Sequence, residues 1–218
     1  PVTAVSECSI TEIGSIWVNG VEYDTTGATI VLDGREYTDR EGTAGGTELN
    51  PGMVVRVEGS IDPNDPARGR AVRVTYGRTL QGPLDGTPTA SGSLTVLGQT
   101  VVVDAALTKL VGIGDSDGDG TPDIGALSDG EMAEISGFTA PDGTIHATYI
   151  KSRQGENELE VVGTVVSVNP PYRLTIGSLT VDTADIGRDV SDLLNQEVEI
   201  QGAVYADGVL SATRLEIK

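Results

Sequence analysis

Residues 196–217 read QEVEIQGAVYADGVLSATRLEI, two alternating runs of residues joined by Asp-Gly. In VEIQGAV (198–204) and ATRLEI (212–217), apolar residues alternate with polar neighbours, as in a strand with one buried face. The Asp-Gly pair at 207–208 is a strong signal for a tight turn between two antiparallel strands. This stretch therefore predicts a β-hairpin.

Related segments occur three times along the chain. Each set contains a strand, a two-strand hairpin around Gly, a variable connector and a second hairpin that ends in a pattern like G-x-(I/V/L)-x-A-x-x-(I/V/L). Five short strands in roughly 60 to 75 residues, with a long connector after the third, is the plan of an OB-like barrel. The sequence predicts an all-β chain with an N-terminal arm or extension strand and three tandem OB-like five-stranded β-barrels, at residues 1–11, 12–77, 78–155 and 156–218.

Four phrases resemble a known family: GSIWVNGVEYDTTGATI (14–30), NPGMVVRVEG (50–59), GSLTVLGQTVVVDA (92–105) and DGTIHATYI (142–150). They are similar to bacterial domain-of-unknown-function family 5666. The resemblance covers nearly all of residues 12–218 and implies strings of OB-like barrels on exported, often surface-attached, proteins. It implies no activity, because the family has no established catalytic motif.

The charge and composition of the chain exclude several classes of partner and site. A formal net charge of −19, spread over 218 residues, repels phosphate backbones and excludes nucleic acid as a partner. One cysteine excludes an internal disulfide and argues against a zinc site, and no apolar run reaches the roughly 20 residues of a transmembrane segment. We expect an extracellular or cell-surface protein whose leader precedes this numbering.

The densest acidic stretch is GDSDGDGTPD at 114–123. Asp115, Asp117, Asp119 and Asp123 stand at positions 1, 3, 5 and 9 of an EF-hand-like loop, and Thr121 at position 7 offers its carbonyl oxygen. The stretch also resembles the calcium repeats of thrombospondin type 3 segments and dockerins. Four carboxylates this close repel one another unless a cation or bulk water separates them. The pattern predicts a Ca²⁺ site, and the alternative is a solvated acidic loop.

The loop departs from the calcium pattern at position 12, where Ala126 replaces an acidic residue. Asp129 or Glu131, a neighbouring barrel or water would then complete the coordination shell. Without a bidentate carboxylate we expect modest affinity, with a dissociation constant of ~10⁻⁴–10⁻³ M.

The N-terminal arm, PVTAVSECSIT (1–11), has the alternation of a strand. Val2, Ala4, Cys8 and Ile10 share one face of it. Two interpretations remain open: the arm packs on its own first barrel, or it adds to a sheet edge of a neighbouring molecule and builds a fibre. Cys8 is expected to fill a small apolar pocket there, and the alternative is an intermolecular disulfide.

The remaining candidate residues are few. Trp17 and Tyr23 either belong to the core of the first barrel or line a ligand groove there, for a glycan or a protein partner. His146 is the only histidine, and no nucleophile–base pair can be assembled around it or Cys8. We therefore expect that the protein is not an enzyme. The sequence favours a calcium-binding structural protein that forms a homo-oligomer or homopolymer, with a surface-attached binding module as the alternative.

Overall fold

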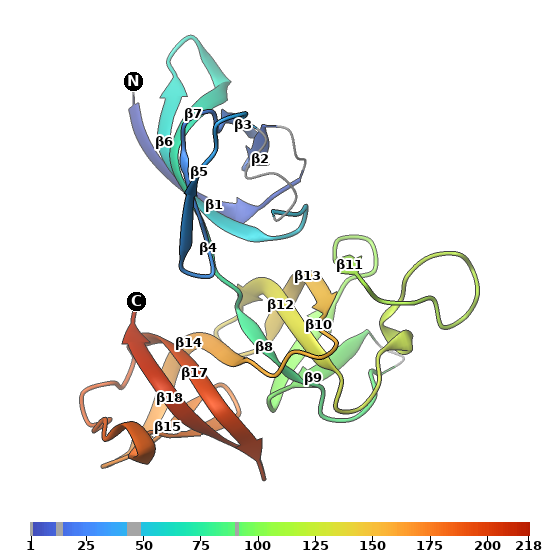
Figure 1. Cartoon of the computed structure of the whole chain (residues 1–218), viewed down its shortest axis with the longest axis vertical. Helices are drawn as coiled ribbons and strands as arrows, with labels where there is room; N and C mark the ends of the chain where they lie inside the picture. Colours follow the sequence, from blue (N-terminus) through green and yellow to red (C-terminus); the bar gives the residue numbers. More distant parts are fainter. Residues whose placement is uncertain (1, 12–14, 43–48, 90–91) are drawn as a thin grey trace. The chain divides into compact units, whose positions relative to one another are not determined.

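The computed structural model describes residues 2–11, 15–42, 49–89 and 92–218, and for residues 2–4 the backbone alone. The chain forms two compact units, Pro1–Gly77 (unit 1) and Arg78–Lys218 (unit 2). Figure 1 shows that both are built from strands, which confirms the all-β class. The helices of the described chain are two single 3-10 turns, and neither has the length or the apolar content of a membrane-spanning helix.

Unit 1 is one 7-stranded sheet, which starts at the N-terminus and ends before the linker to unit 2. Its main path runs β1-β6-β7-β3-β2, while β4 pairs with β7 and β5 pairs with β4. The strands are β1 (Val2–Ser9), β2 (Ile16–Val18), β3 (Val21–Asp24), β4 (Thr29–Leu32), β5 (Arg35–Thr38), β6 (Val54–Asp62) and β7 (Asp65–Tyr76).

Unit 2 is one 11-stranded sheet with two short 3-10 turns. Its first part comprises β8 (Leu80–Pro83), β9 (Ser93–Val96), β10 (Gln99–Val103), β11 (Lys109–Val111), η1 (Ile124–Ala126), β12 (Met132–Thr139) and β13 (Ile145–Ser152). Its second part comprises β14 (Leu159–Asn169), β15 (Arg173–Ile176), β16 (Leu179–Asp182), η2 (Ala184–Ile186), β17 (Glu197–Ala206) and β18 (Val209–Ile217).

The second part of unit 2 is a closed five-stranded barrel. β14 pairs with β15, β15 with β16, β16 with β18, β18 with β17, and β17 again with β14. All of these pairs are antiparallel except β16–β18, which is parallel. The hairpin predicted from residues 196–217 is the β17–β18 pair of this barrel.

The same strand order recurs in the other two strand sets. In unit 1, β1-β6-β7-β3-β2 contains a parallel β3–β7 pair, and in unit 2, β8-β12-β13-β10-β9 contains a parallel β10–β13 pair. Each set also has a glycine at a β-bulge of its long hairpin: Gly59, Gly137 and Gly202. A Cβ on Gly59 or Gly137 would collide with a carbonyl oxygen of the neighbouring strand, so only glycine fits there.

The N-terminal arm is part of unit 1, contrary to the expectation that residues 1–11 stand outside the first barrel. β1 pairs antiparallel with β6 along its whole length. It does so in the register of β14, because Ala4 stands opposite the bulge residue Gly59 as Leu159 stands opposite Gly202. β1 is therefore the first strand of its own set, and of the two interpretations left open, the structure has the arm on its own unit.

Residues 28–38 read ATIVLDGREYT, with Asp-Gly at the centre, and this sequence predicts that they form the first hairpin of the first set. The hairpin in that position is β2–β3. β4 and β5 form an additional hairpin, and β4 runs parallel to the second half of β7.

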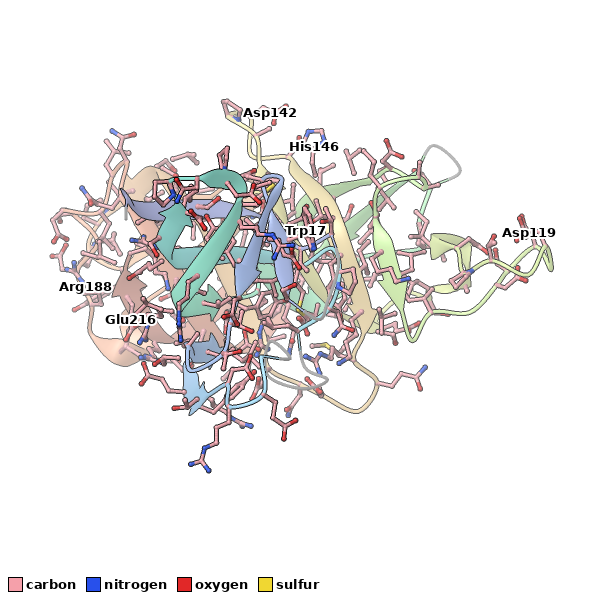
Figure 2. All side chains as sticks on the ribbon, turned by 90° about the horizontal axis from the view of Figure 1, so that it is seen from above. Trp17, Asp119, Asp142, His146, Arg188 and Glu216 are labelled. Carbon is pink, nitrogen blue, oxygen red and sulfur yellow. The ribbon has the colours of Figure 1, made fainter. Side chains whose placement is uncertain are left out.

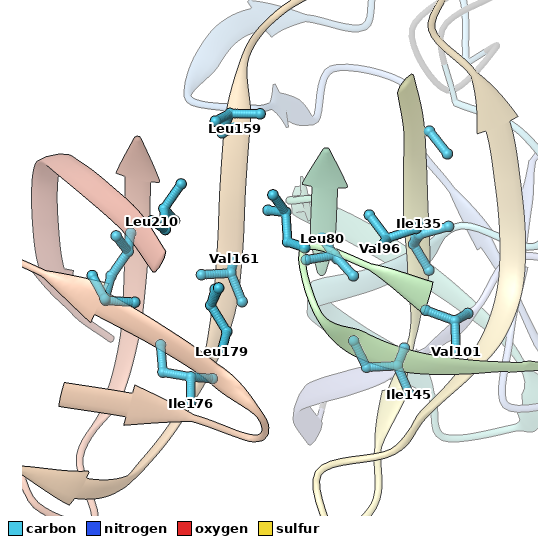
Figure 3. Packing of buried hydrophobic residues seen from close by; sticks show 14 of the residues in the cluster. Leu80, Val96, Val101, Ile135, Ile145, Leu159, Val161, Ile176, Leu179 and Leu210 are labelled. Carbon is cyan, nitrogen blue, oxygen red and sulfur yellow. The ribbon is translucent and has the colours of Figure 1, made fainter. Parts of the chain in front are cut away.

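The two parts of unit 2 are joined by backbone pairing and a shared core. β8 pairs with β12 on one side and with β14 on the other, so the sheet continues across residues 155–156, where a domain boundary was expected. Buried residues of both parts form one hydrophobic cluster, and in Figure 3 Leu80 of β8 lies between Val161 and Val96. Below, the two parts are called the middle and the C-terminal strand sets.

Candidate metal centre

The acidic loop lies between β11 and η1 of the middle strand set. Its base is closed by a hydrogen bond of 3.0 Å from the Asp123 amide to the Gly114 carbonyl oxygen. Asp123 is also the N-cap of η1, because its Oδ1 accepts a hydrogen bond of 2.7 Å from the Gly125 amide. Gly118 and Gly120 adopt positive φ angles of 79° and 91°, which let the chain reverse within the loop.

Asp115 organises the first half of the loop. Its two carboxylate oxygens accept hydrogen bonds of 2.7 Å from the amides of Gly118 and Gly120. These two donors stabilise the charged form, and they hold the pKa of the Asp115 carboxyl below its ordinary value. The carboxylate is therefore ionised at neutral pH.

Asp123 organises the second half through Ser116. Its Oδ2 accepts a hydrogen bond of 2.6 Å from the Ser116 amide, and its Oδ1 accepts one of 2.5 Å from the Ser116 hydroxyl. These bonds lower the pKa of the Asp123 carboxyl, with the hydroxyl of Ser116 as the largest cause. Ser116 was not predicted from the sequence as part of the site. Its position between two of the aspartates is the feature that could have indicated it.

Three of the predicted ligands meet in space. One carboxylate oxygen from each of Asp115, Asp117 and Asp123 lies within 4.8 Å of the other two. Hard oxygen ligands of this kind suit Ca²⁺, Mg²⁺ or Mn²⁺, and Ca²⁺ accepts the most irregular geometry. Asp115 and Asp117 are exposed and Asp123 is half-buried, so water can supply further ligands.

Asp119 and Thr121 face each other instead of this group. The Asp119 carboxylate accepts hydrogen bonds from the amide and the hydroxyl of Thr121. Figure 2 shows Asp119 at the outer end of the loop. Of the four aspartates predicted as ligands, the structure thus brings Asp115, Asp117 and Asp123 together, and Asp119 does not belong to this group.

The two candidate extra ligands have other partners. The Asp129 carboxylate accepts a hydrogen bond of 2.7 Å from the Gly86 amide. The Glu131 carboxylate accepts one of 3.1 Å from the Ser128 amide and one of 2.6 Å from the Ser152 hydroxyl. Neither residue belongs to the group of three carboxylates found among the described residues.

The aromatic pair predicted for a ligand groove is divided between two faces of the β2–β3 hairpin. Tyr23 stands opposite Ile16 and is 1% exposed, so it belongs to the core of unit 1. Trp17, the neighbour of Ile16 along β2, is half-buried on the other face. The two side chains do not form one surface.

The other candidate residues lie on β1, directly after it at Ile10, or on β13. Ile10 is 1% exposed and Cys8 is half-buried, whereas the side chains of Val2 and Ala4 lie outside the described part of the chain. His146 is exposed on β13, opposite Phe138.

The recurring strand order points to a family of repeated β domains, and a family model agrees. The model described as "Domain of unknown function (DUF5666)" matches residues 1–75 and 81–151. These regions cover more than half of the chain, so the chain belongs to this family, and the resemblance noted in the sequence is confirmed. The first match begins at residue 1 and includes β1. No curated protein matches the chain.

Proposed function

We propose that this chain is a calcium-binding, non-enzymatic structural protein that acts outside the cytoplasm. The observation that carries the proposal is the group of Asp115, Asp117 and Asp123, with oxygens within 4.8 Å of one another on a loop folded by its own amide groups. Negative carboxylates at this distance repel one another, and a divalent cation among them offsets that repulsion. Outside the cell, millimolar calcium would occupy even a weak site.

We further propose that all three strand sets are copies of one OB-like barrel. The support is their common strand order, their parallel pair and their bulge glycine, although residues 152–218 lie outside the family matches. In this view the calcium loop is a variable connector of the middle copy. The connector of the C-terminal set contains η2 at the corresponding place.

Calorimetric titration tests the site. After treatment with chelator, the protein should bind one Ca²⁺ per chain with a dissociation constant of ~10⁻⁴–10⁻³ M. Asp117→Asn should weaken binding at least tenfold, because it removes one of the three charges. Asp142→Asn is the matched control, since Asp142 is an exposed aspartate that accepts a hydrogen bond from the amide of Thr144, elsewhere in unit 2.

A titration without saturable heat, or equal losses in Asp117→Asn and Asp142→Asn, would exclude the proposed site. The same titration gives a pH test. The pKa values of Asp115 and Asp123 lie below the ordinary ~3.9, so both carboxylates stay charged and affinity should be constant from pH 8 to pH 6. Binding should weaken in more acidic solution, because protons then compete with the metal for the carboxylates.

Assembly into a fibre through residues 1–11 stays a proposal. The pairing of β1 means that the proposed assembly has to proceed in a different way. Because β1 pairs with β6 of its own unit, β1 has to leave that strand before it can pair with β6 of another copy. Assembly of this kind is an exchange of strands between copies. It should be slow, and it should fail in a chain whose β1 cannot detach.

A further inference from the structure

The last strand of two of the three strand sets has an additional parallel neighbour. β4 pairs with Arg73–Tyr76 of β7, and β11 pairs with Tyr149–Lys151 of β13. Both segments begin two residues after an alanine that stands opposite the bulge glycine, Ala71 in β7 and Ala147 in β13. The additional strand gives the second half of β7 and of β13 a partner on both sides.

The corresponding segment of β18 is Arg214–Ile217, which begins two residues after Ala212. It pairs with β17 on one side. On the other side, β16 reaches only Val209–Ser211, and no strand of the described chain continues beyond it. η2 lies beside β18 but forms no ladder with it. In Figure 1, β18 is the red strand that ends beside the C-terminus.

The side chains of the two segments differ in exposure, as their strand pairing does. Tyr76, the fourth residue of the paired segment of β7, is 2% exposed, whereas Ile217 at the same place in β18 is 52% exposed. The side chains of Arg214 and Glu216 are 54% and 47% exposed, and they form an ion pair with each other. Residues 213–217 of β18, Thr-Arg-Leu-Glu-Ile, thus form a sheet edge that has a strand partner on one side only, and most of their side chains are exposed.

Charged residues on a sheet edge normally prevent edge-to-edge pairing. Here the two charges have opposite sign and flank Leu215 symmetrically. If two copies of the edge meet antiparallel about Leu215, Arg214 of each copy stands opposite Glu216 of the other. Opposite charges in directly facing positions stabilise a strand pair, and like charges oppose it. The charges of the edge are therefore complementary to those of a second copy of the same edge.

We propose that the free edge of β18, residues 213–217, is a docking surface for the same edge of a second copy of this chain. The pairing is isologous, with a twofold axis at Leu215. It extends the sheet of unit 2 into that of the partner and covers Ile217. It requires neither calcium nor the exchange of β1, so it can be tested apart from the proposed function.

The dimer is expected to be weak. Five residues of edge bury less than the ~1,200 Å² of a standard interface. Each copy also carries a net charge of −19, which opposes association at long range. Salt near 0.15 M screens that repulsion beyond about 8 Å and affects facing charges much less.

Sedimentation equilibrium over a range of concentrations in 0.15 M salt, with chelator present, tests the pairing. The wild-type protein should show a reversible monomer–dimer equilibrium. R214E places four acidic side chains across the axis and E216R places four basic ones, so each variant alone should lose at least tenfold in association. An equimolar mixture of R214E and E216R should recover a heterodimer, because every facing pair is then of opposite charge.

R173E is the matched control. Arg173 lies on β15 of the same barrel, its side chain is also 54% exposed, and it also forms an ion pair, with Asp182. R173E should dimerise like the wild type, and circular dichroism should show all variants folded. The proposal is overturned if the wild type stays monomeric at every concentration. It is also overturned if R173E weakens association as much as R214E does, or if the mixture stays monomeric.

Discussion

The hydroxyl of Tyr149 is buried next to an ion pair. The residue is 0% exposed, and its Oη has no hydrogen-bond partner among the described residues. Glu134, also fully buried, accepts a hydrogen bond of 2.7 Å from Nε of Arg153. Burial raises the pKa of Tyr149 to about 12, and the charge of Glu134 adds to this rise. An unpaired buried hydroxyl costs stability, so this residue offers a gain on replacement.

Tyr149→Phe should raise the free energy of unfolding of unit 2 by about 1 kcal/mol at pH 7, because it removes that desolvation cost. The wild type should also lose stability between pH 10 and pH 12. In that window the unfolded tyrosine, with a pKa near 10, has released its proton and the folded one has not. The variant should lose less, as measured by urea unfolding across this pH range.

Tyr205→Phe is the control for this prediction. Burial also raises the pKa of Tyr205 to about 12, but its hydroxyl donates a hydrogen bond of 3.2 Å to Oδ2 of Asp85. Its removal should therefore destabilise unit 2 at pH 7. A loss of stability in Tyr149→Phe as well would show that the hydroxyl of Tyr149 has a partner.

At the scale of single residues, the sequence predicts part of the candidate metal site. The odd spacing of the aspartates indicates that several carboxylates converge, and Asp115, Asp117 and Asp123 do meet. The spacing does not indicate that Asp119 turns toward Thr121, because that depends on which donor is nearest once the glycines have reversed the chain. Asp129 and Glu131 accept hydrogen bonds from Gly86 and Ser152, which lie in segments distant from them in sequence.

At the scale of elements, the sequence predicts the strands better than their assignment to repeats. β8 and β14 each carry a glycine, Gly82 and Gly163, where the side chains of Leu97 and Ile176 approach closely. In β1 the corresponding position is Cys8, as the pairing registers show. Without that glycine, β1 does not resemble the first strand of a repeat. Its role follows only from long-range pairing with β6.

The position of Cys8 allows a direct test of assembly by strand exchange. Cys8 stands opposite Val55 of β6, and facing Cα atoms in an antiparallel pair lie roughly 4.5–5.5 Å apart, within the range of a disulfide. Oxidised Val55→Cys should therefore fix β1 to its own unit. We expect fibres of the reduced variant and of the wild type in electron micrographs, and none of the oxidised variant.

Fibres of the oxidised variant would show that assembly does not use exchange of β1. Wild-type protein that forms no fibres, with or without calcium, would remove the fibre proposal itself. Neither result affects the pairing proposed for β18, which is tested separately by sedimentation equilibrium.

At the scale of the molecule, unit 2 is expected to open as one cooperative body. The middle and C-terminal strand sets share the pairing of β8 with β14 and one hydrophobic cluster. Gln99 of the middle set donates a hydrogen bond of 2.5 Å to the Ile176 carbonyl oxygen of the other. Repeat boundaries in the sequence do not reveal this union, because it depends on few residues at the junction.

Leu80→Ala tests the union, because Leu80 is 0% exposed at the junction. The cavity should cost about 2–5 kcal/mol. Native-state hydrogen exchange should show that loss equally in the slowest amides of β12–β13 and of β17–β18. Leu107→Ala, at a leucine that is 75% exposed in the same unit, should change neither. A loss confined to β12–β13 would show that the two strand sets open separately.

The placement of Trp17 has a practical consequence. It is the chain's one tryptophan, and β2, which carries it, belongs to unit 1. Its emission therefore reports on one of the two units, while the acidic loop belongs to the other. A change of tryptophan fluorescence on adding calcium would therefore mean that calcium binding in unit 2 alters the surroundings of Trp17 in unit 1. The measurement needs no added dye.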